Sequence, residues 1–194
     1  MTLDAAALDL LFLKARTHSH WQASEVPDSL LRQAWDVARM GPTSANCQPL
    51  RIVFARSPEA KERLRPALAP GNIDKTMAAP LTAICAYDLD FPYLLPRLFP
   101  QADAKSWYQG KPELTEATAR LSATLQAAYF LLACRGLGLD LGPMGGFDAV
   151  KLDAAFFPEG RFKSFLLMNI GYGLPDKLYP RNPRLEFDEA CRMS

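Results

Sequence analysis

The chain has 194 residues, of which 49% are hydrophobic and 22% are charged, and its formal net charge is +1. This length and balance are typical of a globular protein with a substantial core, and we predict a single domain over residues 1–194. Because the net charge is close to zero, no overall field would attract nucleic acid or an anionic membrane, and we expect neither as a partner.

The N-terminus gives no sign of a targeting segment, because Asp4 and Asp9 interrupt its apolar residues and no basic leader precedes them. The most apolar run, residues 127–134, is too short to span a bilayer. The four cysteines are widely separated and form no C-x-x-C pair, which favours reduced thiols and a cytoplasmic location. His18 and His20 are the only histidines, so we predict no bound metal.

Hydrophobic periodicity predicts a mixture of helices and strands. Asp4 and Ser57 can each cap the start of a helix, and Gly41 can end another. Residues 69–80 should form a turn and one or two helical turns, and the tail from Leu174 is polar and rich in proline. Helices are expected over residues 4–16, 27–41, 57–68, 113–135 and 148–157, and strands over residues 51–56, 80–88 and 161–173. A short extended piece is expected within residues 135–147.

Residues 89–112 depart from this regularity, because they combine four prolines with five aromatic residues. An irregular but apolar segment of this kind must lie against something. It is either a lid or partner contact, or a packed excursion without a ligand, and both interpretations remain open.

The helix expected over residues 113–135 is apolar on every face beyond Gln126. A helix that is apolar all round is buried all round. In a chain of this size, packing against a second copy is one way to achieve this burial, so the pattern favours a homodimer.

Two turns have the composition of ligand-binding segments. Residues 40–50 hold Thr43, Ser44, Asn46 and Gln48, whose polar groups and nearby backbone amides could bind polar ligand atoms, although an ordinary polar loop has the same composition. Residues 143–146 contain two adjacent glycines, which would let a flat ligand approach the backbone.

Six segments together resemble the FMN-dependent nitroreductase family, and the resemblance covers nearly the whole chain. Within that family the chain is similar to the RutE/HadB-like branch, which contains the malonic semialdehyde reductases of pyrimidine breakdown. The segments, in chain order, are ARTHSHW, GPTSANCQPLRIVF, RLRPAL-APGN-x-x-K, CRGLGLDLGPMGGFD, NIGYG and PRLEFDEAC.

The resemblance implies an α+β nitroreductase-type fold, with a central, mostly antiparallel sheet flanked by helices, in an intertwined homodimer with two FMN sites at the subunit interface. It implies an FMN-dependent NAD(P)H oxidoreductase, with NADH or NADPH as co-substrate and ping-pong hydride transfer through flavin N5. The acceptor it favours is malonic semialdehyde, reduced to 3-hydroxypropionate. A broad nitro- or quinone reductase and a flavin-binding protein without NAD(P)H oxidase chemistry are the alternatives.

The same resemblance assigns residues to the two ends of the flavin. The FMN phosphate would be held by Arg16, Thr17 and Ser19 and by a C-terminal basic pair, Arg181 and Arg184. The loop formed by Pro42, Thr43, Ser44 and Asn46 would contribute to the flavin that is bound mainly by the other subunit.

The flavin ring would meet two further segments. Asn72 and Lys75 match the element near the pyrimidine end, where the Lys75 cation would face the negative charge that develops on reduction. The backbone beside N5 matches Pro143, Met144, Gly145 and Gly146, with the Gly145 N–H directed at N5. Since Lys75 and Gly145 only tune the ring, no catalytic acid or base is expected.

Two positions depart from the pattern of the family. His18 and Ser19 stand where many members have a second Arg or Lys, and Gly145 stands where many have an acidic residue. The loss of a carboxylate beside the substrate face should favour an anionic acceptor such as a small oxo-acid.

Overall fold

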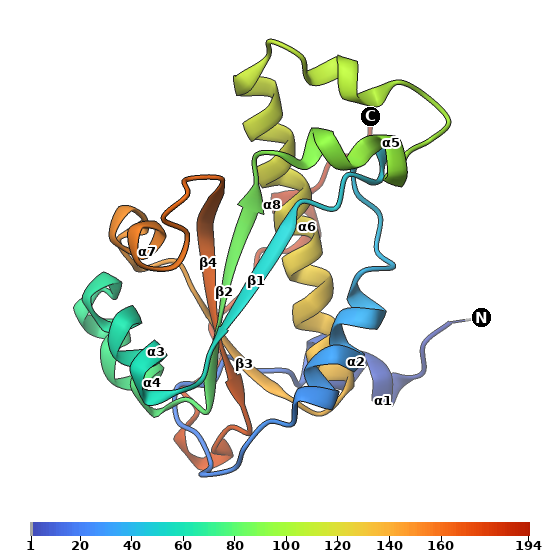
Figure 1. Ribbon diagram of the computed structural model, residues 1–194. Helices are drawn as coiled ribbons and strands as arrows, with labels where there is room; N and C mark the ends of the chain where they lie inside the picture. Colours follow the sequence, from blue (N-terminus) through green and yellow to red (C-terminus); the bar gives the residue numbers. More distant parts are fainter. Residues whose placement is uncertain (1) are drawn as a thin grey trace.

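The computed structural model describes residues 2–194, and in them a four-stranded sheet carries helices on both faces (Figure 1). All neighbouring strands are antiparallel, which confirms the predicted α+β fold. The extended piece expected within residues 135–147 is the edge strand β3. In sheet order, the strands are β1 (Leu50–Ala55), β2 (Leu81–Asp88), β4 (Phe162–Gly171) and β3 (Asp140–Met144).

The helices follow the expected pattern, with one difference near the N-terminus. The Asp4 carboxylate accepts from Ala7 N at 2.8 Å, and the Ser57 hydroxyl accepts from Ala60 N at 3.2 Å, so both predicted caps are confirmed. The first helix continues after four residues as a π-helix, Asp9–Leu13. The α-helices are α1 (Ala5–Leu8), α2 (Asp28–Ala38), α3 (Pro58–Leu64), α4 (Ile73–Ala78), α5 (Leu95–Leu98), α6 (Pro112–Gly136), α7 (Ala149–Phe156) and α8 (Phe187–Ala190).

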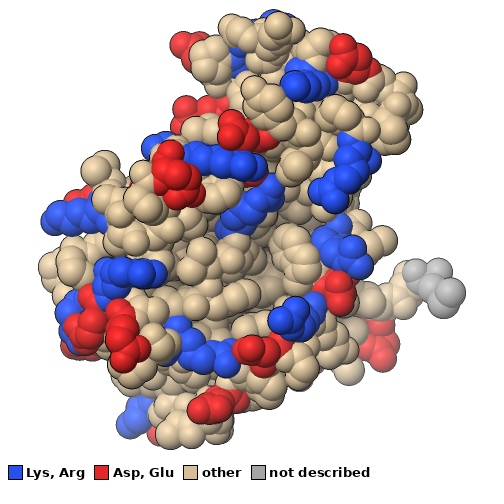
Figure 2. All heavy atoms as spheres, viewed as in Figure 1, with Lys and Arg blue, Asp and Glu red and all other residues tan. Residues whose placement is uncertain are grey.

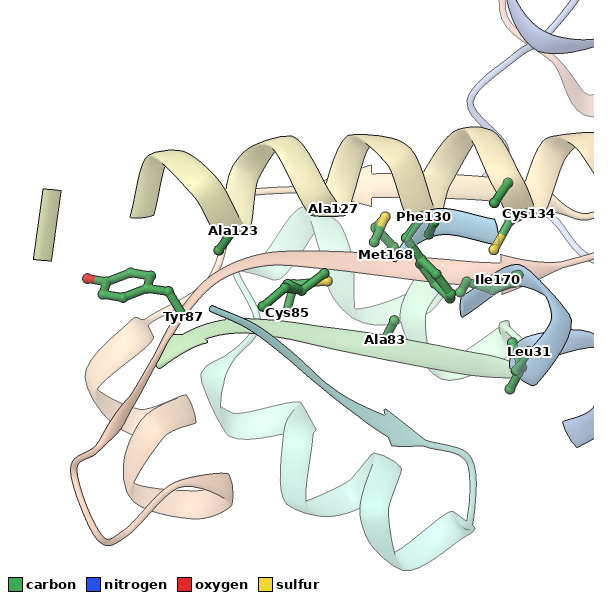
Figure 3. Packing of buried hydrophobic residues seen from close by; sticks show 14 of the residues in the cluster. Leu31, Ala83, Cys85, Tyr87, Ala123, Ala127, Phe130, Cys134, Met168 and Ile170 are labelled. Carbon is green, nitrogen blue, oxygen red and sulfur yellow. The ribbon is translucent and has the colours of Figure 1, made fainter. Parts of the chain in front are cut away.

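The sheet separates two hydrophobic clusters. Alternate residues of β2 point to opposite faces, so Ala83 and Cys85 pack with α2 and α6 while Ile84 packs with α3 and α7. Figure 3 shows α6 crossing above β2 and β4 with Ala123 and Ala127 turned towards the sheet. Because alanine side chains are small, the backbone of this long helix can lie close to the strands.

Residues 89–111 form short helical turns whose inner side chains pack in the hydrophobic core. Phe91 and Leu95 are fully buried, and the rings of Phe91 and Tyr108 meet edge to face with their centroids 4.9 Å apart. Tyr93 and Trp107 remain exposed on the outside of the segment. The excursion is therefore anchored in the core, while its role as a lid or partner contact stays a prediction.

A buried carboxylate fixes the point where the excursion leaves the sheet. Asp88, at the end of β2, accepts two hydrogen bonds from Arg161, each at 2.7 Å, and one from Arg51 at 2.6 Å. Burial alone would raise the pKa of the Asp88 carboxyl, but the two guanidinium groups hold it below its ordinary value.

Much apolar surface remains uncovered on the outer side of α6. Leu121 and Leu125 are 64% and 41% exposed, so within one chain α6 is buried only on its inner side. A groove of about 420 Å³, lined mainly by apolar side chains, lies between α2, α6 and the π-helix. Figure 2 shows a hollow with a largely uncharged floor, and both basic and acidic residues lie around it. No helix within residues 2–194 combines the length and apolarity that a membrane span requires.

Candidate functional site

Residues 17–18 lie along the outer edge of β3, and Trp21 bridges to Gly173 beyond the end of β4. Thr17 forms a parallel bridge with Leu141, and His18 N donates to the Leu141 carbonyl at 3.0 Å. Further along, Trp21 Nε1 donates to the Lys75 carbonyl at 3.2 Å. The predicted phosphate segment therefore lies between β3 and α4, two elements that the sequence assigns to the flavin ring.

The loop after β3 is tied to the segment that starts α4. The Gly146 carbonyl accepts from Ala69 N at 3.1 Å and from Asn72 Nδ2 at 2.7 Å. A Cβ atom built at Gly145 would meet nothing within 4 Å, and among residues 2–194 the Gly145 N–H has no hydrogen-bond acceptor. The structure thus places Asn72 beside Gly146 and next to the open backbone at Gly145.

Lys75 combines a fixed backbone with a free ammonium group. Its carbonyl accepts from Asn169 Nδ2 at 3.2 Å as well as from Trp21. Its side chain makes no hydrogen bond or ion pair with any residue from 2 to 194. The Lys75 charge is therefore available to an anionic group bound at this edge of the sheet.

Two arginines join the C-terminal tail to the start of this segment. Arg16 donates to the Tyr179 carbonyl, and Arg181 Nη2 donates to the Leu13 and Ala15 carbonyls at 2.8 and 2.9 Å. Neither guanidinium has a carboxylate partner in the described part of the chain. Each uses only one nitrogen in these bonds, so several N–H groups remain for a bound anion.

Sequence reasoning assigned no role to Arg135, at the end of α6. Its Nη1 donates to the Leu11 carbonyl at 2.9 Å, and its charge, like that of Arg16, lowers the pKa of His18. Arg135 therefore adds to the positive potential around residues 16–18. The signal was present, because Arg135 lies in the CRGLG part of a segment that carries the resemblance.

His18 is a buried imidazole that holds the segment in place. Its Nε2 lies 3.3 Å from Asp140 Oδ1, and the other oxygen of Asp140 accepts from Gly173 N at 2.8 Å. Its Nδ1 is buried without a partner among residues 2–194. Burial lowers the pKa of His18, against the opposing effect of Asp140, which favours a neutral ring that donates through Nε2.

The structure does not bring the loop at residues 42–46 to this group. The loop precedes β1, at the opposite edge of the sheet from β3 (Figure 1). Asn46 Nδ2 donates to the Leu98 carbonyl at 2.8 Å, and the Tyr129 hydroxyl donates to the Pro42 carbonyl at 3.1 Å. Thr43 and Ser44 lie in the same loop, so a role for these four residues at the β3 edge of the same chain is excluded.

Arg184 also stands apart from the group around β3. Its Nη1 donates only to the carbonyls of Asn182 and Pro183, its own neighbours in the chain. Of the predicted C-terminal pair, Arg181 alone contacts the N-terminal segment. The remaining predicted residues gather around β3: Arg16, Thr17, Ser19, Asn72, Lys75, Pro143, Met144, Gly145 and Gly146.

Known proteins that are similar to this chain in sequence or in fold carry the name nitroreductase. The sequence profile of the nitroreductase family matches residues 13–172. A protein of Burkholderia lata is 55% identical over 192 residues, covering 99% of this chain and 98% of the relative, and one of Rhodopseudomonas palustris is 54% identical with the same coverage. Both carry the provisional name NADH dehydrogenase/NAD(P)H nitroreductase.

Solved structures match the fold over the whole chain. A provisionally named nitroreductase from Bacillus subtilis superposes with a TM-score of 0.90, covering 98% of this chain and 100% of its own, at 19% identity. Another, from Exiguobacterium sibiricum in complex with FMN, has a TM-score of 0.85 at 18% identity and covers 100% of this chain and 99% of its own.

Acidification should destabilise the protein in a way that depends on His18. The pKa of His18 in the folded protein lies below its ordinary value of 6.5. As the pH falls through 6.5, the unfolded chain therefore takes up a proton before the folded chain does, and stability is lost until the pH reaches the folded pKa. Urea unfolding at pH 7 and pH 5 should show a smaller loss for His18→Gln than for wild type. The exposed His20 provides the control, since His20→Gln should retain the wild-type dependence; equal losses in all three proteins would contradict this assignment.

Proposed function

This chain belongs to the nitroreductase family, and we propose that it is an FMN-dependent oxidoreductase that uses NADH or NADPH as electron donor. When bound, FMN supplies the redox chemistry, since it accepts two electrons from a nicotinamide and passes them to an acceptor. The names of the relatives and the FMN in one solved structure of this fold support the two cofactors. The protein then has to bind the flavin, orient it and set the charge around it.

The observation that carries this proposal is a set of cations without carboxylate partners at one edge of the sheet. Arg16, Arg181 and Lys75 form no ion pair with any residue between 2 and 194, although the chain as a whole is nearly neutral. A phosphate carries almost two negative charges and is best held by guanidinium and hydroxyl groups. We assign Arg16 and Arg181, with the hydroxyls of Thr17 and Ser19, to the phosphate.

The ring end of the site fits the geometry around α4 and the loop after β3. Asn72 donates its amide nitrogen to the Gly146 carbonyl, which leaves its oxygen free to accept. The open backbone at Gly145 leaves room for a flat ring to approach the N–H group. Lys75 would stabilise negative charge that develops on the ring during reduction. Pro143 and Met144 complete this wall of the site.

Removing Arg181 should weaken FMN binding. A hydrogen bond to a charged group contributes about 1.5–3 kcal/mol, so we expect the FMN dissociation constant of Arg181→Ala to rise by about tenfold or more. Lys177→Ala, an exposed change in the same tail, is the control and should bind FMN as wild type does. Fluorescence titration of the apoprotein measures both. Arg184→Ala should be measured in the same way. If it binds FMN as tightly as Lys177→Ala does, Arg184 is not part of the FMN site.

We propose that two copies associate through the uncovered face of α2 and α6. Val37 and Gly41 line the apolar groove on this face, and the neighbouring Leu121 and Leu125 are exposed. Burial of such a face is a common basis of stable dimers. Since Gly41 directly precedes the loop formed by Pro42, Thr43, Ser44 and Asn46, the same association would carry that loop to the partner.

Sedimentation should give a dimer of about 43 kDa, twice the 21.5 kDa chain. Leu125→Glu places a charge in the proposed interface and should shift the protein towards monomer. Val150→Glu, on the exposed side of α7, should leave the dimer intact. A wild-type protein that sediments as a stable monomer would contradict the proposal.

For the acceptor, we propose a small oxo-acid, with malonic semialdehyde as the first choice. Lys75 offers an unpaired ammonium, and Gly145 contributes no carboxylate that would repel an anion. A broad nitro- or quinone reductase is the second candidate, and it is favoured by the names of the two relatives. Under either proposal the chain would not need an acid or base of its own for electron transfer.

Anaerobic mixing with NADH or NADPH should bleach the yellow colour of the FMN-loaded protein. A flavin that stays yellow would favour a flavin-binding protein without NAD(P)H oxidase chemistry. Steady-state turnover of malonic semialdehyde should then exceed that of nitroaromatics and quinones. Turnover of the latter alone would establish the second candidate. Lys75→Met should raise the KM for the semialdehyde more than the KM for an uncharged quinone, because only the former carries a carboxylate.

A further inference from the structure

Lys61, on α3, is a buried lysine without an acidic partner. Its side chain is only 4% exposed, and its ammonium donates to the Thr76 carbonyl and the Thr82 hydroxyl, both at 2.8 Å. No carboxylate forms an ion pair with it among residues 2–194. Burial lowers its pKa to about 8.

Such a lysine is a poor choice for stability alone. A buried charge without a counter-ion carries a large desolvation cost, and an apolar side chain of similar shape often packs at least as well. Lys61 also lies on a helix that ends in 3₁₀ turns and that Ser57 already caps. Its presence at a buried position therefore points to a role beyond holding α3 against the sheet.

The bonds of Lys61 begin a chain of buried polar groups. The Thr82 hydroxyl donates to Asn169 Oδ1 at 2.7 Å. Asn169 Nδ2 donates to the Lys75 carbonyl at 3.2 Å and to the Thr76 hydroxyl oxygen at 3.3 Å. The Thr76 hydroxyl lies 3.5 Å from the Met144 sulfur, to which it donates. The chain thus ends at Lys75 and Met144.

The direction of these bonds depends on the lysine. An ammonium can only donate, so the Thr82 hydroxyl accepts a hydrogen bond from Lys61 and donates its own hydrogen bond to Asn169. The Asn169 oxygen consequently faces Thr82, and its NH₂ group faces the Lys75 carbonyl. If Asn169 were turned over, its oxygen would face that carbonyl, and two acceptors would oppose each other inside the core.

We propose that Lys61 is a positioning residue of the flavin site: through Thr82 and Asn169, its ammonium fixes the last turn of α4 and therefore the placement of Lys75. This inference rests on the proposed flavin-dependent function. Lys61 does not touch the ligand, and its effect on FMN binding passes through Lys75.

A double-mutant cycle on FMN affinity tests this role. In the wild-type background, Lys61→Met should weaken FMN binding about fivefold to tenfold, whereas in the Lys75→Met background it should change binding by less than about twofold. A lysine that only stabilised the fold would produce the same change in both backgrounds. Lys111→Met, at the exposed start of α6, is the control and should leave FMN binding unchanged.

Fluorescence titration of the apoproteins gives the dissociation constants, and circular dichroism checks that each variant is folded. Thr82→Val removes the oxygen that accepts from Lys61 and should reproduce the pattern, which keeps the test available if Lys61→Met does not fold. Equal effects in the two backgrounds, or no effect in either, would overturn the role of Lys61. A wild-type protein that takes up no FMN would overturn the proposed function as well, so the two failures are distinguishable.

Discussion

The close approach of residues 17–18 to the edge of β3 is the contact on which the rest of the site depends. It requires two positions without side chains. A Cβ at Gly142 would lie 2.4 Å from the His18 carbonyl oxygen, and a Cβ at Gly173 would lie 1.9 Å from His18 Nδ1. Because backbone and ring occupy this space, Thr17 can bridge to Leu141 and the arginine beside it comes to the strand. Any larger residue at either glycine would push residues 17–18 away from the sheet.

Buried polar groups on this side of the molecule follow a common logic. His18, Lys61 and Asn169 are almost fully enclosed, and each carries hydrogen bonds to backbone or side chains near β3 or α4. Hydrogen bonds offset the cost of burying such groups, apart from the unpaired His18 Nδ1, and they hold the surroundings in one arrangement. The face under α6 is packed mainly with apolar side chains instead. These hydrogen bonds therefore hold β3 and α4 rigidly, on the side where a flat ligand would bind.

Much of the fold could be predicted from the sequence, because its caps and its alternation of apolar residues are local signals. The chain of buried polar groups that begins at Lys61 could not be predicted. Within PEAKERL a lysine looks like an ordinary solvent-exposed residue, and its burial depends on β2 and β4, which are distant in the chain. A weaker signal was present: Thr82 and Asn169 are polar residues that lie between apolar neighbours in β2 and β4. The resemblance placed Arg16, Asn72 and Lys75 in one group, but it could not show that Arg184 bonds only to its own neighbours.

The proposed dimer would account for the loop at residues 42–46. It lies next to β1, whereas the cations lie next to β3, so one chain cannot bring both to a single ligand. Ala45 and Asn46 have φ angles of 47° and 50°, a conformation that is strained for residues other than glycine and that must be held by the surroundings. In a symmetric dimer every contact occurs twice. If the loop of one copy reached the β3 edge of the other, two complete sites would form, and the strain would serve to present its polar groups to a ligand held by the partner.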